Sequence, residues 1–280
     1  MSAPGEVDPA DLLVRARSAL LDVLEGLADQ RAAVVVIGAQ AVYLRTGGVD
    51  VALAEATKDS DVALDPRQLA EDPRVEAAMR AAGFLPSING QPGAWVNPEG
   101  IPVDLMVPER LAGGGGSSAR GARVPPHDKR SMRRARGIEA ALIDNDLMEV
   151  ASLDSSDGRS LRVKVAGPAA LLIAKLHKIA ERASTPHRLN DKDAHDVYRL
   201  LRAVEIEAVH SALQGLMVDP LSAEVTEEAI GHLDALFASG AGALGAEMAG
   251  RAEEGVGDPE QVSVAVSILA GDLLASLRSL

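Results

Sequence analysis

The chain has 280 residues, a net charge of -13 and no cysteine, which excludes disulfides, thiolate metal sites and thiol nucleophiles. Aromatic residues make up only 2% of the chain, which argues against base-stacking platforms, and the acidic charge opposes a general nucleic-acid coat function. There is no uninterrupted apolar run of the ~20 residues that a membrane span needs and no targeting signal at the start, so we expect a cytoplasmic protein without membrane contact.

The first part of the chain predicts an α/β domain. A capping acid and a proline open a helix over 8–29, in which apolar residues recur at spacings of three and four. The apolar run 33–37 predicts a strand buried on both faces, and Gly38 ends it before another helix begins near residue 40. We also expect a helix over 66–82, either continuous or split at Pro73, and strands over 59–64, 84–88, 94–97, 101–107, 147–153 and 161–165.

From residue 168 onward nearly every segment has helical periodicity. Helices are expected over 168–183, 191–203, 205–216, 222–238 and 259–280. The change of pattern near Gly167 divides the chain into an α/β domain, residues 1–166, and an all-α domain, residues 167–280.

Two acids stand two positions apart in the sequence Asp59-Ser60-Asp61. Alternate residues of a strand share a face, so both carboxylates point the same way while Val62 points into the core. Like charges this close repel unless a cation neutralises them, and hard oxygen ligands favour Mg²⁺. Taken alone, such a pair is more typical of a solvated strand end.

A third acid interrupts the alternating strand 101–107. Asp104 is displayed on the face opposite to its apolar residues, where a charge needs a partner or a metal. Alone it fits an exposed edge as well as a site. Together with the acid pair and the glycine that follows a buried strand, it favours a site.

These residues carry a resemblance to known families. Residues 34–44, VVVIGAQAVYL, and 57–64, TKDSDVAL, resemble the Gly-[Gly/Ser]-x(n)-Asp-x-Asp signature of the DNA polymerase β-type nucleotidyltransferase superfamily. Residues 168–176, PAALLIAKL, and 192–201, KDAHDVYRLL, are similar to a narrower group, the abortive-infection nucleotidyltransferase toxins (AbiEii, or MenT-like) of bacterial toxin–antitoxin systems. The chain departs from the pattern in having an alanine as the second turn residue and a longer gap before the acid pair.

The resemblance implies a polymerase β-type core with a mixed sheet, followed by the all-α domain. It implies that the backbone amides of Gly38 and Ala39, with the following helix N-terminus, hold a nucleotide triphosphate. Asp59 and Asp61 would ligate two Mg²⁺ (or Mn²⁺) ions that stabilise an in-line displacement. Asp104 would be a third metal ligand or the base that activates an acceptor hydroxyl.

A basic flank on helix 168–183 adds to the candidate site. Lys175, Lys178 and Arg182 follow one another at spacings of three and four, a pattern that a merely solvated flank also produces. The resemblance assigns Lys175 to nucleotide phosphates, with Lys178 in its place if the helix is read one turn off. It matches Asp193 to an acid that hydrogen-bonds the lysine or closes the site. Thr57 matches a hydroxyl position beside the first Asp, although an ordinary loop threonine fits equally.

The histidines give no sign of a metal site. His177, His187 and His195 are expected on the surface, and no histidine pair has a spacing that predicts a zinc site.

One segment departs from the acidic character of the chain. Residues 119–137 contain seven Arg or Lys and one Asp, a local charge of +6 that leaves -19 for the rest of the molecule. Such a segment is either a solubilising surface or a contact for a polyanion. Beside a transferase site we favour RNA binding, with Arg130, Arg133 and Arg134 on acceptor phosphates.

The sequence therefore predicts a Mg²⁺-dependent nucleotidyltransferase that moves a nucleoside monophosphate from an NTP to an acceptor hydroxyl. The resemblance implies a toxin acting on tRNA 3′ ends, with an antitoxin protein as partner. The alternatives are a non-catalytic binding or scaffolding protein with this fold, and a transferase acting on a protein or small-molecule hydroxyl.

Overall fold

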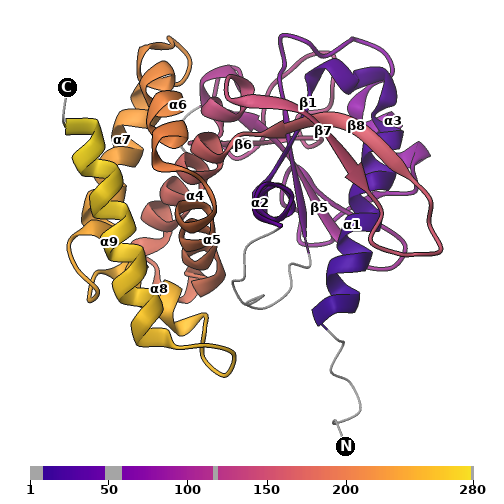
Figure 1. The fold of residues 1–280 in the computed structure, drawn as a ribbon. Helices are drawn as coiled ribbons and strands as arrows, with labels where there is room; N and C mark the ends of the chain where they lie inside the picture. Colours follow the sequence, from indigo (N-terminus) through magenta and orange to yellow (C-terminus); the bar gives the residue numbers. More distant parts are fainter. Residues whose placement is uncertain (1–8, 48–58, 116–118, 279–280) are drawn as a thin grey trace, which may run out of the picture. The chain divides into compact units, whose positions relative to one another are not determined.

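The computed structural model describes residues 9–47, 59–115 and 119–278 (Figure 1). Its strands form one eight-stranded sheet with parallel and antiparallel pairs, in the order β3-β4-β5-β2-β1-β8-β7, with β6 paired to β5. The strands are β1 (Val34–Ile37), β2 (Ser60–Leu64), β3 (Leu85–Pro86), β4 (Ala94–Val96), β5 (Pro102–Pro108), β6 (Arg133–Ala135), β7 (Asn145–Ala151) and β8 (Ser160–Ala166). The predicted class, a mixed α/β sheet followed by a helical region, is confirmed.

Two helices cover one face of the sheet. Helix α1 (Pro9–Gly26) packs on β2 and β5, where the Ser60 hydroxyl donates to the Ala16 carbonyl at 2.9 Å, and α3 (Val75–Ala81) packs on α1 (Figure 1). The connections contain α2 (Gly38–Thr46) and the short 3-10 turns η1 (Ala28–Ala33), η2 (Glu109–Leu111) and η3 (Glu139–Leu142).

Strand β1 lies at the centre of the sheet, antiparallel to β2 and parallel to β8. All four of its residues are buried, as the uninterrupted apolar run predicts. The residue that follows it, Gly38, is therefore presented at the end of a fixed central strand.

The second half of the chain is helical. It contains α4 (Pro168–Ala183), η4 (Pro186–Arg188), α5 (Asp191–Ala203), α6 (Ile206–Val218), α7 (Ala223–Leu233), the π-helical turn η5 (Asp234–Ala238), α8 (Leu244–Arg251) and α9 (Pro259–Arg278). Helix α4 packs against α5 and α7, and α9 packs along α8 and α5 (Figure 1). The observed bounds of α4 and α5 are those that the sequence periodicity predicts.

The chain divides into two compact units by its internal packing. The first comprises Met1–Gln40, Ala56–Ala135 and Asp146–Val165, and the second comprises Ala41–Glu55, Arg136–Asn145 and Ala166–Leu280. The second unit thus holds two earlier segments in addition to the predicted domain 167–280.

The helix expected over 66–82 is wrong in its first half, since α3 begins only at Val75. The Gln30 side chain accepts from the Ala70 amide and donates to the carbonyls of Ala70 and Pro73, at 2.7 to 3.0 Å. These bonds satisfy backbone groups that a helix would otherwise pair, and Pro73 has no amide to offer. The strand expected over 84–88 is also too long, because β3 has two residues.

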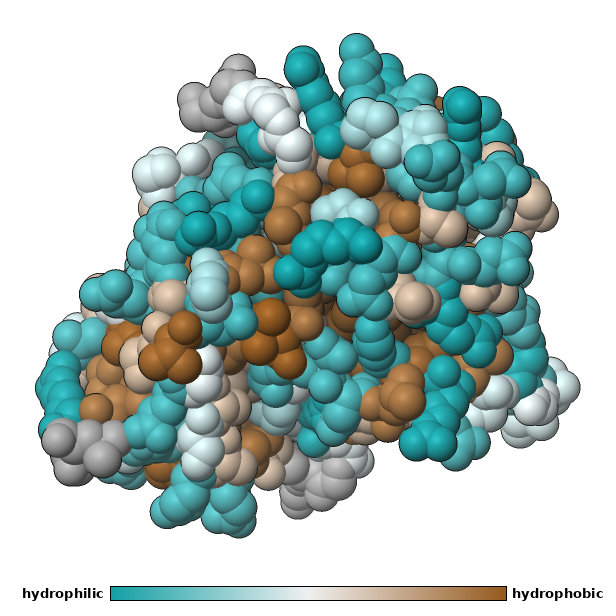
Figure 2. Space-filling view, turned by 90° about the horizontal axis from the view of Figure 1, so that it is seen from above, coloured by the Kyte–Doolittle hydropathy of each residue, from teal (hydrophilic) through white to brown (hydrophobic). Residues whose placement is uncertain are grey.

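Helix α9 is long and apolar enough, by length and composition alone, to cross a membrane. The core helix of a soluble protein passes the same test, and α9 buries Val262, Val266, Ala270, Leu273 and Leu274 within the second unit. Figure 2 shows hydrophilic residues over most of one face of the molecule, with hydrophobic residues in smaller patches between them.

Candidate functional site

The turn between β1 and α2 lies directly against an acid of the neighbouring strand. Ile37 is the register partner of Asp61, and Gly38 has a φ of +69°. A Cβ at Gly38 would fall 2.2 Å from the Asp61 Oδ2 atom, so the site needs glycine both for its backbone conformation and for the close approach. The backbone at the start of α2 is thereby held beside the Asp61 carboxylate.

Two carboxylates meet in register on neighbouring parallel strands. Asp61 on β2 is the Cα partner of Asp104 on β5, so both side chains project from the same face of the sheet. Both residues are half-buried. The next residues, Val62 and Leu105, point to the opposite face and are fully buried. Asp61 and Asp104 thus each project from the face of their strand opposite to the buried apolar residues, as the alternation in the sequence predicts.

The other predicted residues of this group stand differently. Asp59 precedes β2 and is exposed, and Thr57 lies outside the described residues. Ala39 is buried in the first turn of α2. In the described part of the chain, no three His, Asp or Glu side chains are placed to hold one metal ion. Asp59, Asp61 and Asp104 therefore do not form a preassembled three-carboxylate centre.

The donor set still fits a divalent cation. Mg²⁺ is commonly bound through one or two carboxylates together with substrate phosphates and water, rather than in a cage made by the protein alone. Asp61 and Asp104 supply such a pair of hard oxygen donors from adjacent strands. Asp59 stands two residues before Asp61 in the chain.

An arginine of the basic segment reaches the carboxylate pair. Arg133 opens β6, and one of its terminal nitrogens lies 3.1 Å from the Asp104 Oδ2 atom. Arg134 donates to the Gly113 carbonyl at 2.9 Å, and Arg130 donates to the Gly90 carbonyl at 3.2 Å. Of the three predicted RNA-binding arginines, Arg130 is exposed, whereas Arg133 and Arg134 are half-buried.

A buried polar contact secures the start of α2. Arg17 on α1 donates from Nε to the Gln40 Oε1 atom at 2.8 Å, and from a terminal nitrogen to the Ala151 carbonyl at 3.1 Å. Burial lowers the pKa of the Arg17 guanidinium. Sequence patterns alone gave no indication of this contact, because Arg17 reads as an ordinary polar position of an amphipathic helix.

The second unit contains a separate ionic cluster. Lys175 Nζ lies 2.8 Å from Asp193 Oδ1, a hydrogen bond, and 2.6 Å from Asp196 Oδ2, an ion pair that lacks hydrogen-bond alignment. Lys178 and Arg182 also bind the Asp193 carboxylate, at 2.9 and 3.4 Å. The hydrogen bond expected between Lys175 and Asp193 is therefore present. The solvated-flank alternative is wrong for Lys175, which is 5% exposed.

The charges of this cluster stabilise one another. Burial alone would lower the pKa of Lys175, but the carboxylates of Asp193 and Asp196 raise it above its ordinary value. Burial alone would raise the pKa of Asp193, but Lys175 and Lys178 hold it below its ordinary value. Lys175 and Asp193 are accordingly both ionised at neutral pH.

Two of the histidines expected on the surface are buried instead. His195 is 1% exposed and its Nε2 atom lies 2.6 Å from Glu253 Oε1, and His177 is 7% exposed with its Nε2 atom 2.8 Å from the Val225 carbonyl. Burial lowers the pKa of His177. Helical periodicity places both residues beside apolar neighbours, but their polar partners come from distant segments that no local pattern reveals. His187 is exposed, as expected.

Comparison with known proteins finds distant structural likenesses and no sequence match. No family model and no curated protein matches the sequence. A candidate nucleotidyltransferase from H. pylori is 13% identical, with 95% of this chain and 96% of that chain covered and a TM-score of 0.29. JHP933 from Helicobacter pylori is 12% identical, with 97% and 94% covered and a TM-score of 0.29. At this distance neither likeness identifies a family or an activity for this chain.

Proposed function

We propose that this protein is a metal-dependent nucleotidyltransferase that transfers a nucleoside monophosphate from an NTP to an acceptor hydroxyl. The observation that carries the proposal is the register of Asp61 with Asp104 beside the Gly38 turn. Two acids on one face, next to backbone amides at a helix start, suit a bound cation and a polyphosphate together. The sequence resemblance supports the same reading.

The reaction assigns a task to each group of the first unit. The acceptor oxygen forms a bond to the α-phosphorus, the bond from that phosphorus to pyrophosphate breaks, and the hydroxyl proton leaves to a base. Metal ions, when bound, would supply charge stabilisation at the attacking and leaving oxygens. Asp61 and Asp104 would hold these ions, and Asp59 would be a further ligand or would orient them. The amides of Gly38 and Ala39 would bind phosphate oxygens.

The biological role, the acceptor, the partner and the metal are also part of the proposal. The resemblance supports a cytoplasmic toxin that modifies the 3′ end of tRNA, with an antitoxin protein as its partner and Mg²⁺ or Mn²⁺ as its cofactor. Exposed cations of the basic segment, Arg130 among them, are suited to RNA phosphates. In the second unit, Lys178 and Arg182 have partly exposed side chains that could meet an anion, whereas Lys175 is enclosed by its two carboxylates.

Incubation with each labelled NTP, Mg²⁺ or Mn²⁺, and total RNA or a protein fraction tests the activity. We expect labelled RNA and released pyrophosphate from the wild type. Asp61→Asn should abolish transfer without loss of stability, because it removes like-charge repulsion. Asp29→Asn, a change at an exposed carboxylate of η1, serves as the control and should leave transfer unchanged.

The label also separates the alternatives. Label on protein, with none on RNA, would show that the acceptor is a protein hydroxyl and not tRNA. If no acceptor is labelled with any NTP, the non-catalytic binding protein is favoured. Near wild-type turnover of Asp61→Asn at saturating metal would show that the site is misassigned.

A further inference from the structure

Arg133 is held in place by the backbone around it. Strand β6 runs parallel to β5 with Arg133 as the partner of Met106, two residues beyond Asp104 on the same face. The Trp95 indole donates to the Ser131 carbonyl at 3.0 Å, and the Gly93 amide donates to the Arg130 carbonyl at 2.9 Å. The Arg133 side chain therefore starts from a fixed point beside the carboxylates, and is not carried by a free loop.

Gly93, the residue before β4, lies very close to the backbones of β5 and β6. Gly93 has a φ of +76°, and a Cβ there would lie 2.5 Å from the Arg133 backbone nitrogen. A side chain at this position would push β6 away from β5 and would move the guanidinium away from Asp104. The absence of a side chain at Gly93 thus allows the backbones of β5 and β6 to lie as close as they do.

The guanidinium itself is incompletely satisfied. A terminal nitrogen lies 3.1 Å from Asp104 Oδ2, and the side chains of Arg133 and Asp104 are 26% and 22% exposed. The buried Nε atom of Arg133 has no hydrogen-bond partner among the described residues. The guanidinium thus has spare hydrogen-bonding capacity, and the exposed quarter of the side chain gives an anion from solution a route of approach to it.

Arg133 and a metal ion would compete for the same charge. Asp61 and Asp104 repel one another across neighbouring strands, and a nearby cation relieves that repulsion. In this structure Arg133 forms an ion pair with one oxygen of Asp104. A cation that binds both carboxylates must take over part of that contact.

We propose that Arg133 is an exchangeable counter-cation of the carboxylate pair. It neutralises Asp104 while the site is without metal, yields that carboxylate to the divalent ion, and then holds a phosphate oxygen of the nucleotide. The planar fork of a guanidinium matches a phosphate group, and the Arg133 side chain is partly exposed beside Asp104. This inference rests on the proposed nucleotidyltransferase function.

Binding measurements test the exchange without any need for turnover. Mn²⁺ affinity is measured by calorimetry without nucleotide, and the affinity for a non-hydrolysable NTP analogue is measured at saturating Mn²⁺. We expect Arg133→Met to bind Mn²⁺ roughly fivefold more tightly, because a competing cation is removed. The same variant should bind the NTP analogue about tenfold or more weakly, because a charge-assisted contact is lost.

Two further variants isolate the role of the guanidinium. Arg80→Met removes the same charge from an exposed position of α3 and should change neither affinity. Arg133→Lys keeps the charge without the fork, so we expect wild-type Mn²⁺ affinity and only partial recovery of nucleotide affinity. If Arg133→Met does not fold, as judged by circular dichroism, Arg133→Gln takes its place with the same expectations.

The outcomes distinguish this inference from the proposed function. If wild-type protein binds Mn²⁺ and loses it on Asp61→Asn, the carboxylate site stands. With that site established, unchanged or weaker Mn²⁺ binding by Arg133→Met (or by Arg133→Gln in its place) overturns the exchange, and unchanged nucleotide affinity of the same variant overturns the phosphate contact. If the wild type binds no Mn²⁺, or Asp61→Asn binds it normally, the proposed function fails and the exchange fails with it.

Discussion

Lys175 is stable as a buried cation only because two carboxylates surround it. Asp193 and Asp196 lie 2.8 and 2.6 Å from its ammonium, and all three side chains are less than a tenth exposed. When one member of a buried ion pair is removed, the other is left as an uncompensated charge. Lys178 binds the same Asp193 from a position that water reaches more easily, with 35% of its side chain exposed.

Substitution of the two lysines should therefore have unequal effects on stability. We expect Lys175→Met to lower the free energy of unfolding by about 3–5 kcal/mol, because Asp196 and Asp193 lose their buried partner. Lys178→Met should cost less, about 1 kcal/mol, because water reaches the Lys178 side chain and Lys175 still neutralises Asp193. Urea denaturation followed by circular dichroism measures both. Equal losses of unfolding free energy would contradict the inference that Lys175 is the main cation partner of Asp193 and Asp196.

The same geometry separates a structural role for Lys175 from a catalytic one. A variant that remains folded at low temperature can be tested for binding of an NTP analogue. If Lys175→Met binds the analogue normally while Lys178→Met does not, the phosphate contact belongs to the more exposed lysine. The sequence order of the two residues could not decide this, since both lie on one flank of the helix.

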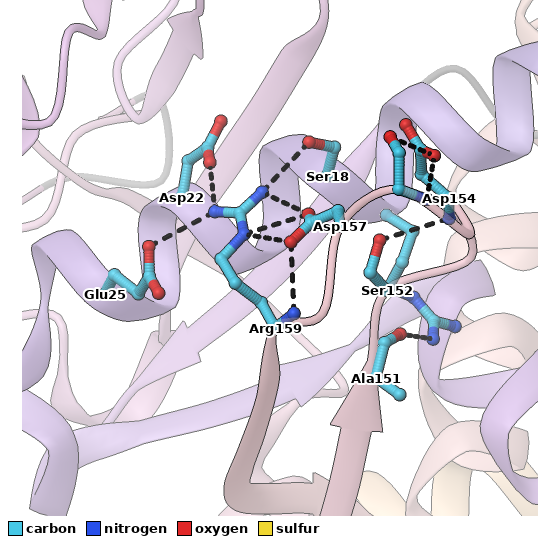
Figure 3. A network of polar contacts seen from close by, with 10 residues as sticks. Ser18, Asp22, Glu25, Ala151, Ser152, Asp154, Asp157 and Arg159 are labelled. Atoms are coloured by element: carbon cyan, nitrogen blue, oxygen red, sulfur yellow. Dashed lines mark hydrogen bonds and ion pairs between the residues drawn. The ribbon is translucent and has the colours of Figure 1, made fainter.

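The tip of the β7–β8 hairpin is fastened to α1 through one arginine. Arg159 donates to Asp157 within the hairpin and to Asp22, Glu25 and Ser18 on α1, with distances of 2.6 to 3.2 Å. Figure 3 shows all of these acceptors arranged around a single guanidinium. Because β7 is an edge strand, this network is what we expect to restrain its outer end.

We expect Arg159→Met to release the hairpin tip from α1. The amides of β7 should then exchange with solvent faster, whereas β1 at the centre of the sheet should remain protected. Hydrogen exchange measured by mass spectrometry reports both strands. The control is Arg162→Met, which removes a charge from an exposed position of the same strand β8. Unchanged exchange in β7 would show that the network does not restrain the hairpin.

The network should also depend on pH in a defined direction. Hydrogen bonds from Arg159 lower the pKa of Asp157 from 3.8 to about 2. A carboxyl whose pKa is depressed on folding stabilises the protein above its unfolded pKa, and this contribution is lost as the pH falls toward the folded value. The difference in melting temperature between wild type and Asp157→Asn should therefore be largest above pH 4 and should shrink toward pH 2.

The elements that the sequence predicts well are those fixed by local pattern. Helices α4 and α5 have the predicted bounds because apolar periodicity, a proline at the start and a capping asparagine all act locally. The wrong or missing predictions concern segments whose structure depends on tertiary contacts. Residues 66–74 are held by Gln30 in place of helical bonds, and β6 exists only because β5 lies beside it.

Helix α8 is not among the helices that the sequence predicts, and it contains Gly245 and Gly250. A Cβ at Gly245 would lie 2.5 Å from the Phe237 ring, and one at Gly250 would lie 2.2 Å from the Ser263 hydroxyl oxygen. These glycines allow close packing against η5 and α9 rather than a turn. The candidate site follows the same division: Asp61, Asp104 and Gly38 are visible in the sequence, whereas the pairing of Arg133 with Asp104 depends on strand register.

The second unit is built from more than the C-terminal segment of the chain. Asp144 lies in the earlier segment Arg136–Asn145, and its Oδ2 atom accepts from the Ala170 amide at 2.9 Å. Its backbone carbonyl also accepts from the Gly167 amide at 2.8 Å. Gly167, the residue before α4, has no side chain with which to cap the helix. The capping oxygen for α4 is therefore supplied from outside the predicted domain 167–280.

The same earlier segment covers part of the helical core. Ile138, Ala140 and Ala141 are each at most 5% exposed, and η3 packs on α4 and α7. Arg136 adds contacts of 2.7 Å to Glu224 and Glu228 on α7. A fragment that begins at residue 167 would lack both the cap and this cover.

We therefore expect fragment 136–280 to be more stable to urea than fragment 167–280. The cap contributes about 1 kcal/mol, and burial of the three apolar side chains adds roughly 2–4 kcal/mol. A synthetic peptide of residues 136–145, added in excess to fragment 167–280, should restore part of the difference. The same peptide with Asp144→Ala should restore less, because it cannot supply the capping oxygen. If the two fragments unfold at the same urea concentration, with or without peptide, the boundary belongs near Gly167 and the earlier segment is only a covering loop.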